Sequence, residues 1–137
     1  MKTIRILLLA ATVVAGPARA GDMVVIVNKA NDNSIDKNLV MKVYAGESKS
    51  WANGGAIAAF DLPEDNPARA SFASEVMGKT VANMKALWAQ NVFAGKAVPP
   101  KVVPSDDEVK KTVAANKGAI GYIKAGAADD SVKVVVK

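Results

Sequence analysis

The sequence predicts an α/β protein in which helices pack on a mixed, mostly parallel sheet. Short runs of β-branched residues alternate with longer segments whose apolar residues recur at helical spacing. Such alternation is typical of a sheet covered by helices. Half of the residues are hydrophobic and the chain has no cysteine, so a hydrophobic core rather than disulfides must stabilise the fold.

Residues 1–20 are expected to be a cleaved signal peptide. Lys2 and Arg5 begin it, an apolar run follows, and Ala18-Arg19-Ala20 is a small-x-small cleavage motif. The run is too short for a membrane span, so we expect residues 21–137 to form one exported domain without a membrane anchor, periplasmic in a Gram-negative host. Losing three basic residues lowers the formal net charge from +5 to +2, which argues against a nucleic-acid partner.

The first half of the domain reads as strand, helix and strand. Residues 23–28 form a continuous β-branched run, typical of a strand buried on both faces. Residues 35–44 have helical spacing, with Ser34 or a neighbour as the N-cap and Gly46 as the end. Residues 56–60 predict a second buried strand.

The second half continues the alternation. Asn66 caps a helix over 68–77, and Thr80 caps another over 81–92 with an apolar stripe that includes Val92.

Prolines keep residues 98–104 extended, and Ser105 begins a capping-box helix. Residues 119–123 and 132–136 predict two last strands. The spacing also predicts two ion pairs, Asp106 with Lys110 and Asp107 with Lys111.

The helix that starts at Asn66 suggests an anion site. Pro67 suits the first helical position, and a helix that begins where a strand ends directs backbone N–H groups and a positive dipole end into a crevice. We expect Asn66, the N–H groups of Ala68 and Arg69, the Arg69 guanidinium and Ser105 to surround a small oxyanion.

A purely structural interpretation stays open. Asn66 and Ser105 are good helix caps by themselves, and Glu64 and Asp65 would complement the helix dipole while repelling an anion. Trp51 is expected in the core or at its rim rather than against a ligand.

Other chemistries are excluded or unsupported. Without His or Cys the chain has neither the usual zinc ligands nor an imidazole-based triad. Asp61, Glu64 and Asp65 are too few oxygen donors for calcium. We therefore expect no metal, no cofactor and no enzymatic activity.

Four segments follow one another over nearly all of the mature chain: residues 39–46, Trp51-x-Asn-Gly, the strand leading to Phe72, and Lys117-Gly-Ala-Ile-Gly-Tyr122. Their order resembles that of the periplasmic phosphate-binding proteins, the substrate-binding components of phosphate ABC transporters. The resemblance implies a single lobe of a type-2 periplasmic-binding-protein-like fold.

The resemblance also places the family's phosphate-binding turn on residues 66–68. Its serine becomes Asn66, its threonine becomes Ala68 without a hydroxyl, and its arginine becomes Leu62. The family's acidic residue becomes Glu64, whose oxygens would accept a hydrogen bond from the proton of hydrogen phosphate. Arg69 is the local replacement for the positive charge that is lost at Leu62.

Two functions follow. The first is a solute-binding protein for phosphate or a similar oxyanion, acting with an ABC permease or pairing with a second copy of itself. The alternative is an accessory or interaction protein that keeps the scaffold without the ligand.

Overall fold

The computed structural model describes residues 22–137, so the predicted signal peptide lies outside the described part. Five strands form one sheet in the order β3-β2-β4-β1-β5. β2 pairs in parallel with β3 and β4, whereas β1 pairs antiparallel with β4 and β5. The predicted mixed α/β sheet is confirmed, but it is not mostly parallel, since two strand pairs are parallel and two are antiparallel. The strands are β1 Met23–Val27, β2 Ala58–Asp61, β3 Lys101–Val102, β4 Ala119–Lys124 and β5 Lys133–Val136.

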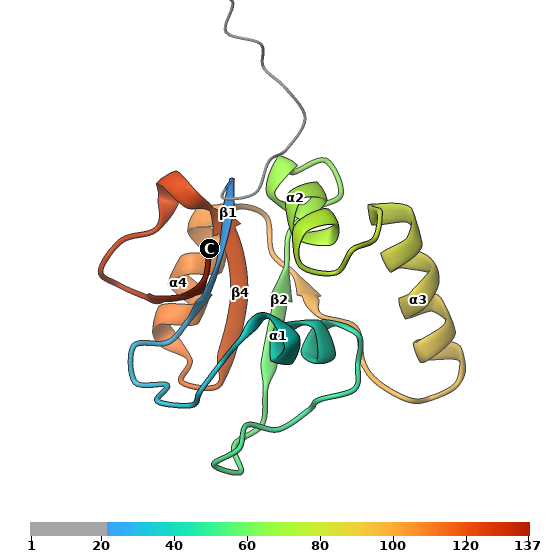
Figure 1. The fold of residues 1–137 in the computed structure, drawn as a ribbon, viewed down its shortest axis with the longest axis horizontal. Coiled ribbons are helices and arrows are strands. Elements are labelled where there is room, and N and C mark those ends of the chain that lie inside the picture. The colour runs from blue at the N-terminus through green and yellow to red at the C-terminus, as the bar shows by residue number, and fades with distance from the viewer. Residues whose placement is uncertain (1–21) are drawn as a thin grey trace, which may run out of the picture.

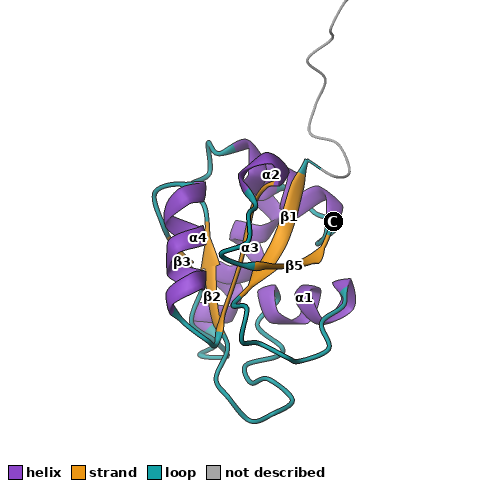
Figure 2. Ribbon diagram, turned by 90° about the vertical axis from the view of Figure 1, so that its left-hand side faces the viewer, coloured by secondary structure: helices purple, strands orange, loops and turns teal. Residues whose placement is uncertain are grey.

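Helices cover both faces of this sheet, α4 on one side and α1 with α2 on the other (Figures 1 and 2). β1 lies between β4 and β5 in the sheet and between the two helix layers. All five of its residues are therefore buried, as its apolar run predicts. The helices are α1 Lys37–Tyr44, α2 Pro67–Glu75, α3 Val81–Phe93 and α4 Asp106–Ala115, followed by a short 3₁₀ turn, η1 Ala125–Ala127.

The helix starts agree with the local sequence. Asn66, Thr80 and Ser105 each accept a hydrogen bond from a backbone N–H of the first turn that follows, as predicted. The first helix is capped by Asp36, a neighbour of Ser34. Caps depend on contacts two or three residues apart, which is why the sequence predicts them well.

The two predicted ion pairs of α4 are wrong. Lys110 instead binds Asp129, with Nζ 2.8 Å from Oδ2, and Lys111 lies 3.9 Å from Glu108. Asp106 is unavailable to Lys110 because its carboxylate accepts hydrogen bonds from Asn66 and from the backbone of Lys124. These two donors come from other elements, and helical spacing alone cannot reveal them.

The predicted apolar stripe of α3 is only partly correct. α3 lies beside the β3–β2 edge of the sheet (Figure 1), so Val92 is 53% exposed instead of packed in the core. Side chains hold the helix in place: Trp88 Nε1 donates to the carbonyl of Tyr44 (2.9 Å) and Asn91 Nδ2 to that of Ala45 (3.0 Å). α3 thereby satisfies carbonyls at the C-terminal end of α1.

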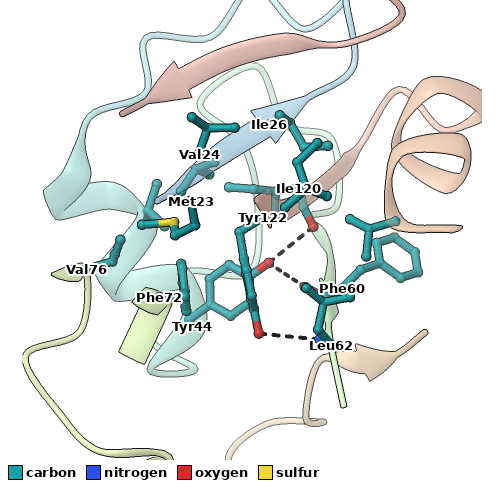
Figure 3. Packing of buried hydrophobic residues seen from close by; sticks show 14 of the residues in the cluster. Met23, Val24, Ile26, Tyr44, Phe60, Leu62, Phe72, Val76, Ile120 and Tyr122 are labelled. Carbon is teal, nitrogen blue, oxygen red and sulfur yellow. Dashed lines mark hydrogen bonds between the residues drawn. The ribbon is translucent and has the colours of Figure 1, made fainter. Parts of the chain in front are cut away.

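Two tyrosines join β2 to β4 where the strand ladder ends. β2 and β4 pair only at Ala58 with Ala119 and at Ala59 with Ile120. Beyond these pairs the hydroxyl of Tyr44 donates to the carbonyl of Phe60 at 2.7 Å and also lies 3.3 Å from that of Ile120 (Figure 3).

The second hydroxyl, that of Tyr122, accepts from the N–H of Leu62 at 3.3 Å and donates to the carboxylate of Asp61. The rings of Tyr122 and Phe72 stack with their centroids 4.2 Å apart, and Tyr44 meets both rings edge-on. Burial, with Asp61 nearby, raises the pKa of both tyrosines, so the hydroxyls stay neutral donors. Side chains thus replace the missing rungs of the sheet.

Gly121 allows α4 to approach β4. A Cβ at this position would lie 2.5 Å from Val109 Cγ1 and 3.4 Å from Val113 Cγ2. Both valines are fully buried, so neither has room to move aside.

We predict that Gly121→Ala lowers the free energy of unfolding by about 1–3 kcal/mol, the usual cost of overpacking a core. Gly126→Ala is the matched control, because nothing lies within 4 Å of its Cβ position. Equilibrium urea unfolding measures both. Equal stability of the two variants would contradict the close packing of α4 on β4.

Candidate functional site

The predicted anion site lies where β2 ends and α2 begins, next to the start of α4. Asn66 Oδ1 accepts from the N–H of Ala68 at 2.9 Å, and Asn66 Nδ2 donates to Asp106 Oδ1 at 2.8 Å. The other oxygen of Asp106 accepts from the N–H of Lys124 at 2.7 Å. The N-terminal ends of α2 and α4 therefore meet around the carboxylate of Asp106.

Arg69 lies beside this junction with its guanidinium turned back toward β2. Its Nη1 donates to the carbonyl of Leu62 at 2.8 Å, and its Nη2 lies 3.7 Å from Asp61 Oδ2. Both side chains are largely buried, 15% and 18% exposed. The cation is part of a fixed cluster with Asp61 and Tyr122.

Glu64 is engaged with α3. Its Oε1 lies 2.8 Å from Lys85 Nζ, and both side chains are more than half exposed. The hydrogen bond and charge of Lys85 hold the pKa of Glu64 below its ordinary value. This carboxylate stays ionised at neutral pH.

Ala68 and Ser105 contribute through their helices. Ala68 is buried and offers only its N–H, which Asn66 already occupies. Ser105 Oγ accepts from the N–H of Glu108 at 3.2 Å, so it caps α4 as its sequence pattern indicates. Of the predicted site residues, the structure brings Asn66, Ala68 and Arg69 to one place, with Ser105 next to Asp106.

Sequence reasoning missed Asp106 as the centre of this junction. The signal was present, because Asp106 is the first residue of a helix and an acidic side chain there favours nearby N–H donors. Its partners Asn66 and Lys124 are 40 and 18 residues away, so only the fold reveals them.

This junction brings positive helix ends and carboxylates together, because Asp61 lies beside Arg69 and the first turn of α4 carries Asp106, Asp107 and Glu108. Two helix dipoles point their positive ends at it, and Arg69 adds a guanidinium nearby. Among residues 22–137, no helix is long and apolar enough to cross a bilayer, and no group of three or more acidic side chains is arranged to hold a metal ion. The predicted donors are already bound within the protein, since Asn66 accepts from the N–H of Ala68 through Oδ1 and from the N–H of Arg69 through its carbonyl oxygen at 3.0 Å.

Comparison with known families decides the classification. A family model described as "PBP superfamily domain" matches residues 10–136. The chain belongs to this family. No curated protein matches the chain.

Solved structures share the fold of this PBP domain. An ABC-type phosphate transport receptor from Vibrio cholerae has a TM-score of 0.65 at 24% identity, over 83% of this chain and 45% of its own. A putative phosphate ABC transporter substrate-binding protein from Clostridium perfringens, solved with bound phosphate, has a TM-score of 0.66 at 21% identity, over 83% and 44%. PstS from Borrelia burgdorferi has a TM-score of 0.64 at 17% identity, over 84% and 46%.

The PBP domain therefore spans less than half the length of these structures. At such identities the likeness shows the fold and not the ligand. The fold expected from the resemblance, a single lobe of the periplasmic-binding-protein type, is confirmed.

Proposed function

We propose that this PBP domain is a periplasmic solute-binding protein that holds phosphate or a similar small oxyanion and acts with an ABC-type transport system. It binds its ligand without converting it. The family and the fold support the solute-binding role, and the similar phosphate receptors from Vibrio cholerae and Clostridium perfringens suggest phosphate.

The observation that carries the proposal is the carboxylate of Asp106 between α2 and α4. Its two oxygens already accept from Asn66 Nδ2 and from the N–H of Lys124. Two oxygens of a phosphate have the same need for donors, so an incoming oxyanion would take over these donors as Asp106 turns away. The guanidinium of Arg69 would turn toward the bound oxyanion, because it can donate two parallel hydrogen bonds to a tetrahedral oxyanion.

Competition from Asp106 predicts weak binding by one copy alone. An open face with an internal carboxylate offers few free donors, and hydrogen bonds at a solvent-exposed site contribute little net energy. Additional donors would come from a second copy of the domain or from the permease, both of which face the same junction in this proposal.

We predict that removing the competitor strengthens binding. Asp106→Ala should lower the dissociation constant for phosphate about tenfold or more, because hydrogen bonds to charged groups contribute about 1.5–3 kcal/mol. Arg69→Ala should weaken binding, and Lys79→Gln, on the exposed loop between α2 and α3, is the control. Isothermal titration with phosphate, and with sulfate or chloride at equal ionic strength, measures this.

Thermal unfolding provides a second measurement. Phosphate at 100 times its dissociation constant should stabilise the domain by about 2.7 kcal/mol. A flat titration and an unchanged melting temperature at millimolar phosphate, for both the natural chain and Asp106→Ala, would refute phosphate binding at this junction.

The second candidate function, an accessory or interaction protein, is favoured by an exposed apolar patch. Phe93 is 95% exposed and Val98 87%, and Val92 and Val102 are also more than half exposed. Beside the patch, a groove of about 920 Å³ between α3 and β2 is lined by apolar side chains and by three lysines, with no acidic residue from the described part of the chain. A partner protein with apolar and acidic side chains would complement it.

We predict that p-benzoylphenylalanine in place of Phe93 forms a discrete photo-crosslinked product in periplasm, whereas the same probe in place of Lys111 does not. The double variant Lys96→Glu and Lys101→Glu should abolish that product, because reversed charge repels an acidic partner. Equal crosslinking at both positions, or a product that is insensitive to charge reversal, would contradict this candidate.

A further inference from the structure

A second pocket lies at the opposite end of the central strands from the start of α2. It has a volume of about 400 Å³ and is formed where β1 ends and where β2 and β4 begin. Three loops line it with four asparagines, one lysine and one tryptophan: Asn31, Asn33, Asn53, Asn116, Lys117 and Trp51.

Asn31 lines this pocket and carries a buried donor that has no acceptor among the described residues. Its Oδ1 accepts from the backbone N–H of Asn33 at 3.0 Å and from Asn33 Nδ2 at 2.8 Å, and this fixes which side of the amide is oxygen. Asn31 is only 2% exposed, and its Nδ2 donates to no acceptor in the described part of the chain. A buried donor without an acceptor is costly and rare, so this N–H group needs an oxygen atom that accepts its hydrogen bond.

Two more asparagines present the same group. Asn53 Oδ1 accepts from the N–H of Gly55 at 3.2 Å, and Asn116 Oδ1 accepts from the N–H of Gly118 at 3.0 Å. Since a backbone N–H can only donate, these bonds also fix the amide orientation. Each side chain therefore keeps its NH₂ group available for an acceptor.

The walls that carry these groups are tied together. Trp51 Nε1 donates to the carbonyl of Gly118 at 3.0 Å, which joins the second loop to the third. A Cβ on Gly118 would lie 2.5 Å from the carbonyl oxygen of Ala56, so only glycine allows this approach. The pocket is preformed, which reduces the entropy lost on binding.

We infer that this pocket binds a small oxyanion, a carboxylate or an inorganic anion, through the NH₂ groups of Asn31, Asn53 and Asn116 and the ammonium group of Lys117. Among residues 22–137, Lys117 is the only charged residue that lines it, and Asp32 is not among the lining residues. The carbonyl oxygen of Asn33 is the remaining side-chain acceptor. A neutral polyol would leave most of its hydroxyl hydrogens unpaired among these donors, whereas an oxyanion brings acceptors alone.

Nuclear magnetic resonance tests this site separately from the α2 junction. In a uniformly ¹⁵N-labelled full chain, sodium succinate and sodium phosphate are titrated at constant ionic strength, with sodium chloride and glycerol as controls. The side-chain NH₂ signals of Asn31, Asn53 and Asn116 should shift together with one dissociation constant. The NH₂ signals of Asn66 and Asn38 report on the α2 junction and on an unrelated surface.

Variants assign the shifts to the pocket. Lys117→Gln should weaken binding roughly tenfold without affecting the fold, since its side chain is exposed, and Lys79→Gln should not change it. Asn31→Ala should abolish binding, and Lys117→Gln keeps the test decisive if Asn31→Ala does not fold.

Three results would overturn the inference. These are no shift of the three signals with either anion, equal shifts with glycerol or chloride, and shifts confined to Asn66. The last result would support anion binding at the α2 junction while excluding this pocket, so the two proposals fail separately.

Discussion

The fold depends on two tyrosine hydroxyls that bridge β2 and β4 beyond the point where the two strands stop pairing. The two strands share only two residue pairs, yet both must leave the core in fixed positions, because α2 starts after one and η1 after the other. Tyr44 and Tyr122 supply the partners that a longer ladder would have supplied, and Phe72 packs against both rings. A buried carbonyl or N–H without such a partner would cost about 1–3 kcal/mol.

This arrangement places polar side chains at both ends of β2 and β4. At the C-terminal end the two strands have separated, which leaves room for Asn66, Asp106 and Arg69 to form the α2–α4 junction. At the N-terminal end the two strands are still paired, and the loops that precede them are held close by the indole of Trp51. A short parallel pairing thus gives the domain one open junction and one preformed pocket.

Much of the fold could be predicted because its signals are local. Apolar runs marked the central strands, and Asn66, Thr80 and Ser105 marked helix starts through contacts within one turn. The rest required the three-dimensional arrangement. Helical spacing predicts a pair of Asp106 with Lys110, but donors 40 and 18 residues away bind Asp106 instead. α3 lies beside the edge of the sheet instead of on its face, so Val92 is exposed. The asparagine pocket is built from three loops, so no single stretch of sequence reveals it.

The Tyr44 hydroxyl replaces a missing rung between β2 and β4. Urea unfolding of Tyr44→Phe tests it most directly, since phenylalanine keeps the ring and removes only the oxygen that bonds the carbonyls of Phe60 and Ile120. We expect a loss of about 1–3 kcal/mol in the free energy of unfolding, with an unchanged dependence on urea concentration. A variant as stable as the natural chain would contradict it.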